Sequence, residues 1–287
     1  MKNTSCAFVF VWHFFTRLVA SSLVVGGMLG LGGMLGLTAA AQAKNADAHA
    51  HQDSRKKLVM LIAEPEYETA HTLPEFASQH LQKDFRVVVV AGSTEPGAVA
   101  FSNIEELADA DVLLVSVRRR TPPREQLDAI RRYVKSGRPV VGIRTASHAF
   151  KLMTGSVPAG DADWPEWDAE VIGGNYHNHY RIGSISTVTA ADRPDSALLS
   201  GVSLPFTSQS TLYKVSPLRP GAEALLVAAI PGESAQPVAW TFTHIGGGRT
   251  FYTSLGSPAD FKNASFVHLL RNGIFWAAGL SVGEAAK

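Results

Sequence analysis

Cysteine is nearly absent from this chain of 287 residues, and its single copy, Cys6, lies close to the amino terminus. A segment with the features of an export signal surrounds Cys6, so the mature chain is expected to contain no thiol. A chain without thiols forms no disulfide framework, no cysteine-ligated metal site and no cysteine nucleophile. These three classes of chemistry are therefore excluded for the mature protein.

A strong excess of charge is absent as well. The sequence has 26 basic and 25 acidic residues, and removal of Lys2 and Arg17 leaves 24 against 25, a net charge near −1. The arginine triplet at 118–120 is typical of a solvated strand end. With this balance we expect no nucleic-acid partner.

The first 43 residues have the pattern of a signal peptide. Lys2 and Arg17 are their only charges, residues 18–41 are apolar, and Ala41-Gln42-Ala43 suits signal peptidase. Cleavage after Ala43 predicts a periplasmic or secreted protein without stable membrane contact. The alternative is an uncleaved membrane anchor, because the apolar run is also long enough to span a bilayer.

The remaining chain has the length of one domain. Residues 44–56 are polar, carry two histidines and are predicted to be a flexible linker. Residues 57–281 form the predicted domain, which is long enough to bury a substantial core, and residues 282–287 form a tail.

The first half of this domain alternates apolar runs of strand length with helical patterns. Strands are predicted at 57–63, 85–91, 111–117 and 139–143. Helices are predicted at 72–82, 103–108, 121–136 with Thr121 as N-cap, and 146–153. This order predicts an α/β fold, a doubly wound and mostly parallel sheet with helices on both faces.

The second half has a different character. Residues 155–183 are irregular and rich in Pro, Trp, Gly and Asn, and long segments of this kind usually carry function. Antiparallel or mixed strands are predicted at 184–190, 224–230, 237–243 and 249–255. A final helix is predicted at 265–278.

The turn after the fourth predicted strand places Arg144 where hydrolases and amidotransferases hold their nucleophile. A guanidinium stays protonated and is no nucleophile, but its fork binds carboxylates, phosphates or paired hydroxyls. We therefore interpret Arg144 as a substrate-binding residue. The structural alternative is an internal ion pair with Glu64 or Glu66.

His148 follows one helical turn later and is a candidate general acid or base. His177 and His179 are further candidates, but in extended chain they point to opposite sides. Either of them, with His148 and an acid, gives a metal site as the weaker alternative. We expect the histidines to bind a polar ligand instead, and we predict no metal and no cofactor.

Aromatic side chains lie beside carboxylates in the irregular segment. Trp167 and Tyr176 flank Asp168, and this combination suits sugar rings, which have an apolar face and a hydroxyl rim. The alternative is a loop that folds back on its own aromatic residues. Glu64, Glu66 and Tyr67 follow the first predicted strand, where they either face the same crevice or begin a helix.

Four segments resemble the ThuA-like (trehalose-utilisation-like) family of the class I glutamine amidotransferase-like superfamily: 142–148, 168–179, 237–240 and 248–256. This resemblance implies a three-layer, flavodoxin-like fold and a link to sugar metabolism in exported proteins. Many relatives have His in place of Arg144 and Gly-His in place of Gly256-Ser257. The family lacks the Cys-His-Glu machinery of amidotransferases, and this chain lacks the cysteine too.

We therefore expect an exported protein of carbohydrate utilisation, a hydrolase or lyase acting on a glycoside or oxidised sugar. Arg144 holds the substrate in this hypothesis, and His148 or His177 moves the proton with an acid partner from Glu64, Glu66 or Asp168. The rival hypothesis is a non-catalytic domain that binds a sugar or a partner enzyme. A homo-oligomer is compatible with both.

Overall fold

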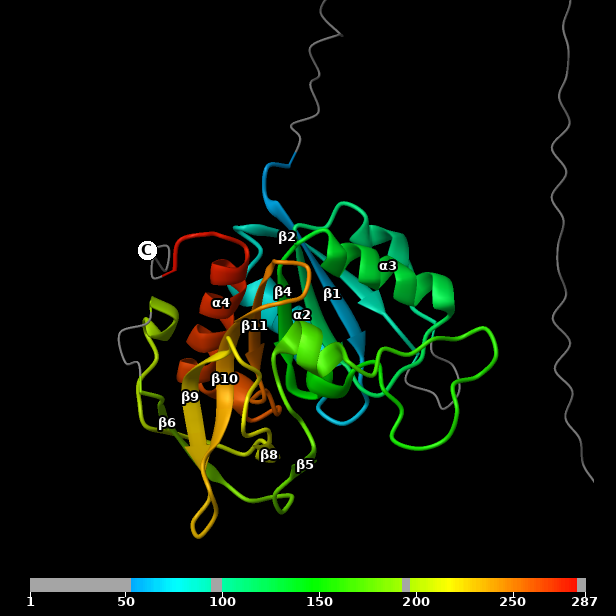
Figure 1. Ribbon diagram of the computed structural model, residues 1–287. Coiled ribbons are helices and arrows are strands. Elements are labelled where there is room, and N and C mark those ends of the chain that lie inside the picture. Colours follow the sequence, from blue (N-terminus) through cyan, green and yellow to red (C-terminus); the bar gives the residue numbers. More distant parts are fainter. Residues whose placement is uncertain (1–52, 94–99, 193–196, 283–287) are drawn as a thin grey trace, which may run out of the picture. The chain divides into compact units, whose positions relative to one another are not determined.

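The structure, a computed structural model, describes residues 53–93, 100–192 and 197–282 (Figure 1). The predicted signal peptide at 1–43, most of the predicted linker and the residues after 282 lie outside this range. Within it, no helix combines the length and apolar character needed to cross a membrane.

A nine-stranded mixed sheet forms the centre of the domain, in the order β2-β1-β3-β4-β11-β10-β9-β6-β7. Neighbours from β2 to β11 are parallel: β2 (Phe85–Ala91), β1 (Lys56–Ala63), β3 (Val112–Val117), β4 (Val140–Ile143) and β11 (Arg249–Thr253). The chain runs from β1 outward to β2 and then returns to β3 on the other side of β1. This reversal is the switch point of a doubly wound sheet, where ligands usually bind at the carboxyl ends of the strands.

The other half of the sheet is antiparallel, as the alternating sequence pattern predicts. It consists of β10 (Gln236–Thr243), β9 (Glu223–Ala229), β6 (Ser186–Ala190) and β7 (Phe206–Ser208). A separate pair, β5 (Asn178–His179) and β8 (Tyr213–Lys214), lies in the loop region. A turn at Gly246–Gly248 joins β10 to β11, and the His244 amide donates to the Gly248 carbonyl at 2.9 Å.

Helices cover both faces of the parallel strands because those strands are apolar on both sides. Leu58, Met60 and Ile62 pack with α2 (Thr69–His80) and α4 (Ala264–Ala277), whereas Val59 and Leu61 pack with α3 (Arg124–Lys135). Figure 1 shows α3 and α4 on opposite sides of the parallel strands. The short turns are η1 (Ile104–Leu107), η2 (Arg144–His148), η3 (Asp168–Ile172), η4 (Ala197–Leu199) and η5 (Asp260–Lys262).

Two local predictions are wrong. Thr121 is not the N-cap of α3, because Pro123 occupies that position in an extended conformation and α3 begins at Arg124. The helix predicted at 146–153 is only the five-residue turn η2. Carbonyls that would continue it are taken by other groups: Ala146 O by the Trp167 indole, and the oxygens of His148 and Ala149 by the amides of Arg119 and Arg120.

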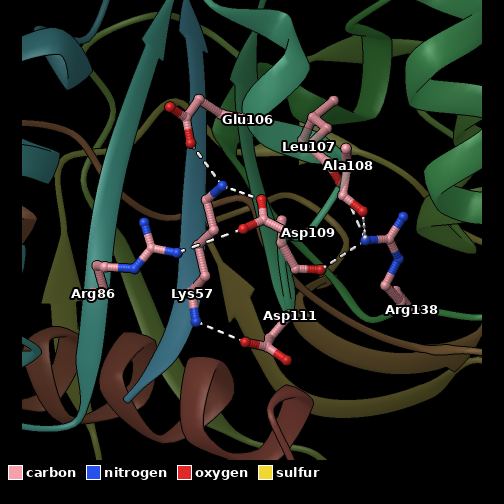
Figure 2. Close-up of polar contacts among 9 residues, drawn as sticks. Lys57, Arg86, Glu106, Leu107, Ala108, Asp109, Asp111 and Arg138 are labelled. Carbon is pink, nitrogen blue, oxygen red and sulfur yellow. Dashed lines mark hydrogen bonds and ion pairs between the residues drawn. The ribbon is translucent and has the colours of Figure 1, made fainter. Parts of the chain in front are cut away.

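Charged side chains at the amino-terminal edge of the parallel strands are closely paired (Figure 2). The ammonium of Lys57, whose side chain is 5% exposed, pairs with Glu106 at 2.6 Å and with Asp109. The Lys57 amide donates to the Asp111 carboxylate at 2.7 Å. Arg138 donates to three carbonyls at 2.9–3.1 Å, those of Leu107, Ala108 and Ala110. We call these residues the amino-edge cluster.

Candidate functional site

Polar residues converge at the opposite, carboxyl-terminal edge of the parallel strands. Arg118 and Arg119 directly follow β3, and η2 directly follows β4. Gly142 in β4 allows this close arrangement, since a Cβ there would lie 2.8 Å from the Tyr252 ring and 2.9 Å from Ile172. The backbone of Arg144 turns sharply into η2 with a φ of 50°, a conformation that is uncommon outside glycine.

The side chain of Arg144 is completely buried beneath this edge. Its guanidinium lies over the rings of Tyr67 at 4.1 Å and Tyr213 at 4.5 Å, and its Nη1 donates to the carbonyls of Thr211 and Ser254. Nε and Nη2 are buried without a hydrogen-bond partner among the described residues. Arg144 is thus a buried cation held by rings and carbonyls.

Neither glutamate proposed as an ion-pair partner contacts this guanidinium. Glu64 is buried and accepts bonds from the amides of Glu66 at 2.9 Å and Thr69 at 3.0 Å, and from the Thr69 hydroxyl at 2.7 Å. Glu66 pairs with Arg118 at 2.8 Å. Glu64 therefore holds the start of α2, and the alternative of an Arg144 ion pair with either acid is wrong.

His148 lies at the end of η2 and is only 7% exposed. Its ring stacks on Tyr176 with 4.4 Å between centroids, and Nδ1 lies 3.1 Å from the Ser147 hydroxyl. Burial, followed by the nearby positive charges of Arg119, Arg118 and Arg144, lowers its pKa to about 2. His148 is consequently neutral at physiological pH, a hydrogen-bonding group and a weak base.

Asp168 begins η3 and faces the same region. One carboxylate oxygen accepts from the Tyr176 amide at 2.6 Å, and the other, Oδ1, is buried without a hydrogen-bond partner in the described part of the chain. Gly174 packs so closely that a Cβ there would lie 2.4 Å from Oδ1. Burial raises the pKa of Asp168 to about 7, against the lowering effects of the Tyr176 amide and Lys151.

The aromatic residues of the irregular segment have mixed roles. Trp167 is almost fully buried and donates its indole N–H to the Ala146 carbonyl at 2.7 Å. Trp164 packs edge-on against Trp167 and donates to Glu170 at 2.8 Å. Tyr176 is half-buried, so it keeps a surface beside His148. The loop does fold back on its tryptophans, yet its aromatic surface also lines the pocket described next.

A pocket of about 370 Å³ brings part of the predicted site together. Of the predicted residues, it is lined by His148, Asp168, His177, Trp167 and Tyr176. Outside its lining are Arg144, Glu64, Glu66, Tyr67 and His179. Neither the Arg144 nor the Glu64 side chain reaches this pocket. The pocket therefore gives no support to sugar binding by Arg144 or catalysis by Glu64, and both stay predictions.

Sequence reasoning missed three polar groups in the pocket wall, namely Arg119, Ser147 and Lys151. Arg119 carried a usable signal, because it directly follows β3 and the carboxyl ends of adjacent parallel strands share one crevice. Lys151 carried no signal, since its position depends on how the chain turns after η2. We call the hollow lined by these residues, His148 and Asp168 the carboxyl-edge pocket.

A larger hollow of about 590 Å³ lies between α2, α4 and the loop after η4. It shares no lining residue with the carboxyl-edge pocket, and burial, followed by the nearby charges of Arg271 and His268, lowers the pKa of its His80. We place the site in the smaller pocket, because two groups with strongly shifted pKa values face it and it lies at the ligand-binding edge of the sheet.

The chemistry open to this pocket follows from its two titratable groups. A carboxyl group with a pKa near 7 exchanges protons efficiently at neutral pH, while a neutral imidazole accepts a hydrogen bond. His148 is too weak a base to activate Ser147 as a nucleophile. In the described residues, no three His, Cys, Asp or Glu side chains lie close enough together to hold a metal ion.

Known proteins agree with this architecture. The family model of ThuA, described as trehalose utilisation, matches residues 44–277. No curated protein sequence matches the chain. A ThuA-like protein from Parabacteroides merdae has a similar structure, with a TM-score of 0.54 and 15% identity over 81% of this chain and 94% of that one. At this identity the likeness concerns the fold alone.

Two carbohydrate-active enzymes show weaker structural likeness. An exo-β-1,4-mannosidase from Opitutaceae bacterium strain TAV5 has a TM-score of 0.42 and 12% identity, over 85% of this chain and 39% of the enzyme. A β-galactosidase from the Antarctic haloarchaeon Halorubrum lacusprofundi has a TM-score of 0.48 and 13% identity, over 82% of this chain and 33% of the enzyme. This chain therefore spans well under half of either enzyme.

Proposed function

Because the chain belongs to the trehalose utilisation (ThuA) family, we propose that it is an exported protein that processes a glycoside or an oxidised sugar in its carboxyl-edge pocket. The observation that carries this proposal is the pairing of Asp168 and His148 in one pocket with pKa values shifted in opposite directions. Groups shifted apart in this way mark the acid and base assignments of an active site.

Asp168 transfers the proton in this mechanism. With a pKa of about 7, it is partly protonated at neutral pH, so it can donate a proton to a leaving oxygen or take one from a sugar carbon or water. His148, fixed against Tyr176, accepts a hydrogen bond from a sugar hydroxyl. The half-buried Tyr176 ring provides apolar surface for a sugar ring. The reaction class is hydrolysis or elimination.

The finer fold assignment is the class I glutamine amidotransferase-like arrangement. It is supported by the strand order β2-β1-β3-β4 and by the strained turn at Arg144, which follows β4 where the superfamily's nucleophile is expected. An arginine there has no nucleophilic chemistry, and the mature chain has no cysteine to replace it. Amidotransferase activity is therefore excluded from the proposal.

One observation favours a second function, that of a non-catalytic sugar-binding domain. Arg144, at the position of the strained turn, is buried and bound to carbonyl groups of its own chain, so this position supplies packing instead of chemistry. Under this alternative the pocket binds a sugar, but Asp168 transfers no proton.

Turnover as a function of pH separates the two functions. The purified chain is incubated with a panel of neutral glycosides and their keto and acid forms, and products are measured for wild type, Asp168→Asn and a control, Asp109→Asn. Asp109 is a carboxylate of the amino-edge cluster, at the opposite edge of the sheet from the pocket. We expect turnover with a pH dependence near 7 that is lost about a hundredfold or more in Asp168→Asn and kept in the control.

Two results would count against the proposal. Turnover that survives Asp168→Asn removes Asp168 from the mechanism. Sugar binding in the pocket without turnover of any panel member, together with unchanged binding by Asp168→Asn, favours the non-catalytic domain.

A further inference from the structure

The carboxyl-edge pocket carries more positive than negative charge in its wall. Two cationic side chains line it, Arg119 and Lys151, against a single carboxylate, that of Asp168. Because the pKa of this carboxyl is raised to about 7, it bears only part of a negative charge at neutral pH. The wall is therefore cationic, and an uncharged sugar makes no use of that charge.

Arg119 is fixed beside the pocket by its backbone. Its φ of 50° is a strained conformation, and its amide donates to the His148 carbonyl at 3.1 Å. Its Nη1 lies 3.5 Å from the Lys151 carbonyl, which brings the guanidinium beside Lys151. Strain of this kind persists at functional sites where the surrounding structure holds the residue in place.

The neighbouring Arg118 gives a direct contrast. Its guanidinium pairs with Glu66 at 2.8 Å and does not line the pocket. Arg119 and Lys151 have no carboxylate partner among the described residues. The guanidinium of Arg118 is thus occupied by an ion pair within the protein, whereas the two cations of the pocket wall remain available to a ligand.

Buried groups in the pocket respond to the same positive potential. After burial, the charges of Arg119, Arg118 and Arg144 are the next causes that lower the pKa of His148. Arg144 adds to this potential from below the pocket, because it is fully buried and has no acidic partner in the described part of the chain. A positive potential in a partly buried cleft attracts anions and raises their local concentration.

We propose that the ligand of this pocket is a sugar acid, a monosaccharide or glycoside that carries a carboxylate, and that Arg119 and Lys151 bind this carboxylate. The proposal rests on the proposed carbohydrate function. A guanidinium fork matches the geometry of a carboxylate, and an adjacent ammonium complements its remaining charge. With the carboxylate at Arg119, the sugar ring lies along Tyr176, with its hydroxyls toward His148 and Asp168.

A carboxylate fits this wall better than a phosphate does. Phosphate sites typically combine cations with backbone amides at a helix N-terminus or in a glycine-rich loop. Here the cations belong to side chains, and the element beside them, η2, is a turn of only five residues. One guanidinium and one ammonium, with Asp168 opposite, suit a single negative charge.

Equilibrium binding tests the proposal with three matched probes, D-glucuronate, D-glucose and D-glucose 6-phosphate. Each is titrated calorimetrically into the purified chain and into Arg119→Gln, Lys151→Gln and the control Arg118→Gln, at low and at raised salt. Lys151 is exposed and the side chain of Arg118 is 32% exposed, so neither substitution leaves a buried cavity. Circular dichroism checks the fold of Arg119→Gln.

We expect glucuronate to bind about tenfold or more tightly than glucose, because charge-assisted hydrogen bonds contribute of that order. This preference shrinks with salt, and it falls by about tenfold in Arg119→Gln and somewhat less in Lys151→Gln, but stays within about twofold in Arg118→Gln. Equal binding of glucose and glucuronate overturns the sugar-acid proposal and leaves the carbohydrate function standing.

The remaining outcomes are equally decisive. A preference for glucose 6-phosphate overturns the assignment to a carboxylate. A glucuronate preference that Arg119→Gln and Lys151→Gln both leave intact moves the anion site elsewhere. Failure of all three probes to bind, with a folded protein, counts against the proposed carbohydrate function itself as well as against its sugar-acid form.

Discussion

Ionisable side chains at the two edges of the parallel sheet differ in how completely their polar atoms are paired. At the amino edge, Lys57 is held by two carboxylates, and Arg138 donates to three carbonyls (Figure 2). At the carboxyl edge, Arg144 keeps two nitrogens and Asp168 keeps one oxygen buried without a hydrogen-bond partner in the described residues. Both edges hold ionisable groups, but of the two sets only the carboxyl-edge one has buried polar atoms without a hydrogen-bond partner among the described residues.

This difference separates structural charge from functional charge. Buried polar groups in proteins are almost always satisfied, so an exception in a pocket wall indicates a ligand or a tuned titration. Glu64 shows that the carboxyl edge can satisfy a buried carboxylate, since four donors of the α2 start bind it. The unpaired oxygen of Asp168 is therefore a specific property of the pocket and not of the whole edge.

The largest effect on stability is expected from a substitution in the amino-edge cluster. Arg138→Met removes the guanidinium donor from the carbonyls of Leu107, Ala108 and Ala110, and should lower the free energy of unfolding by about 3 kcal/mol. Urea denaturation measures this loss. Arg132→Met, an exposed arginine of α3, is the control and should stay within about 0.5 kcal/mol of wild type. A loss below about 1 kcal/mol in Arg138→Met contradicts the structural role.

At the carboxyl edge, neutralising Asp168 should stabilise the protein at alkaline pH. Its folded pKa of about 7 lies above the unfolded value of 3.8, so the folded state binds more protons and wild-type stability falls as pH rises between these values. Asp168→Asn removes this loss and should be more stable than wild type by about 2 kcal/mol at pH 8, allowing for partial exposure. The gain should vanish near pH 4.

Urea denaturation across pH checks this sign, with Asp109→Asn as the amino-edge counterpart. Hydrogen bonding to Lys57 lowers the pKa of Asp109, so its replacement should give the opposite sign and a loss at neutral pH. If both aspartate variants lose stability equally at pH 8, the contrast between the edges is wrong.

Replacement of His148 should have a smaller effect on stability, and this effect should appear at acidic pH. Its folded pKa of about 2 lies below the unfolded value of 6.5, so the unfolded state gains the proton and wild-type stability falls as pH drops below 6.5. Relative to wild type, His148→Gln should therefore gain about 1 kcal/mol between pH 7.5 and 5.5. Thermal unfolding at the two pH values measures it, and a constant difference would show that His148 is not buried in its neutral form.

Arg144 should have the smallest effect on stability despite being the most buried charge. Arg144→Met gives up two carbonyl contacts and two ring contacts but also removes the desolvation penalty of an unpaired cation. We expect its free energy of unfolding to stay within about 1 kcal/mol of wild type. A loss as large as that of Arg138→Met means that Arg144 belongs with the structural charges.

The fold was largely predictable from the sequence, because its strands are continuous apolar runs that must be buried on both faces. The strand at Phe85–Ala91 matches its prediction at both ends, and α4 is displaced by one residue. The helix predicted after β4 failed for a tertiary reason: residues from β3 and the later loop bind the carbonyls that would have extended it. No local pattern contains that information.

The candidate site was predictable only in part. His148, Asp168 and His177 were identified by motif and line one pocket, because His148 follows the end of β4 and the irregular segment returns to the same edge. Glu64 and Arg144 follow strands too, but their side chains turn inward to α2 and to the carbonyls of later loops. The direction of a side chain depends on partners that are distant in sequence, whereas Arg119, which directly follows β3, could have been identified.

Titration of the aspartate carboxyl carbons by NMR tests the central claim most directly, with Asp168→Asn to assign the key signal. We expect one aspartate to titrate near pH 7, this signal to be missing in Asp168→Asn, and Asp109 to titrate below its ordinary value. If no aspartate titrates above about pH 5, the carboxyl edge holds no tuned acid and its pocket has no special chemistry.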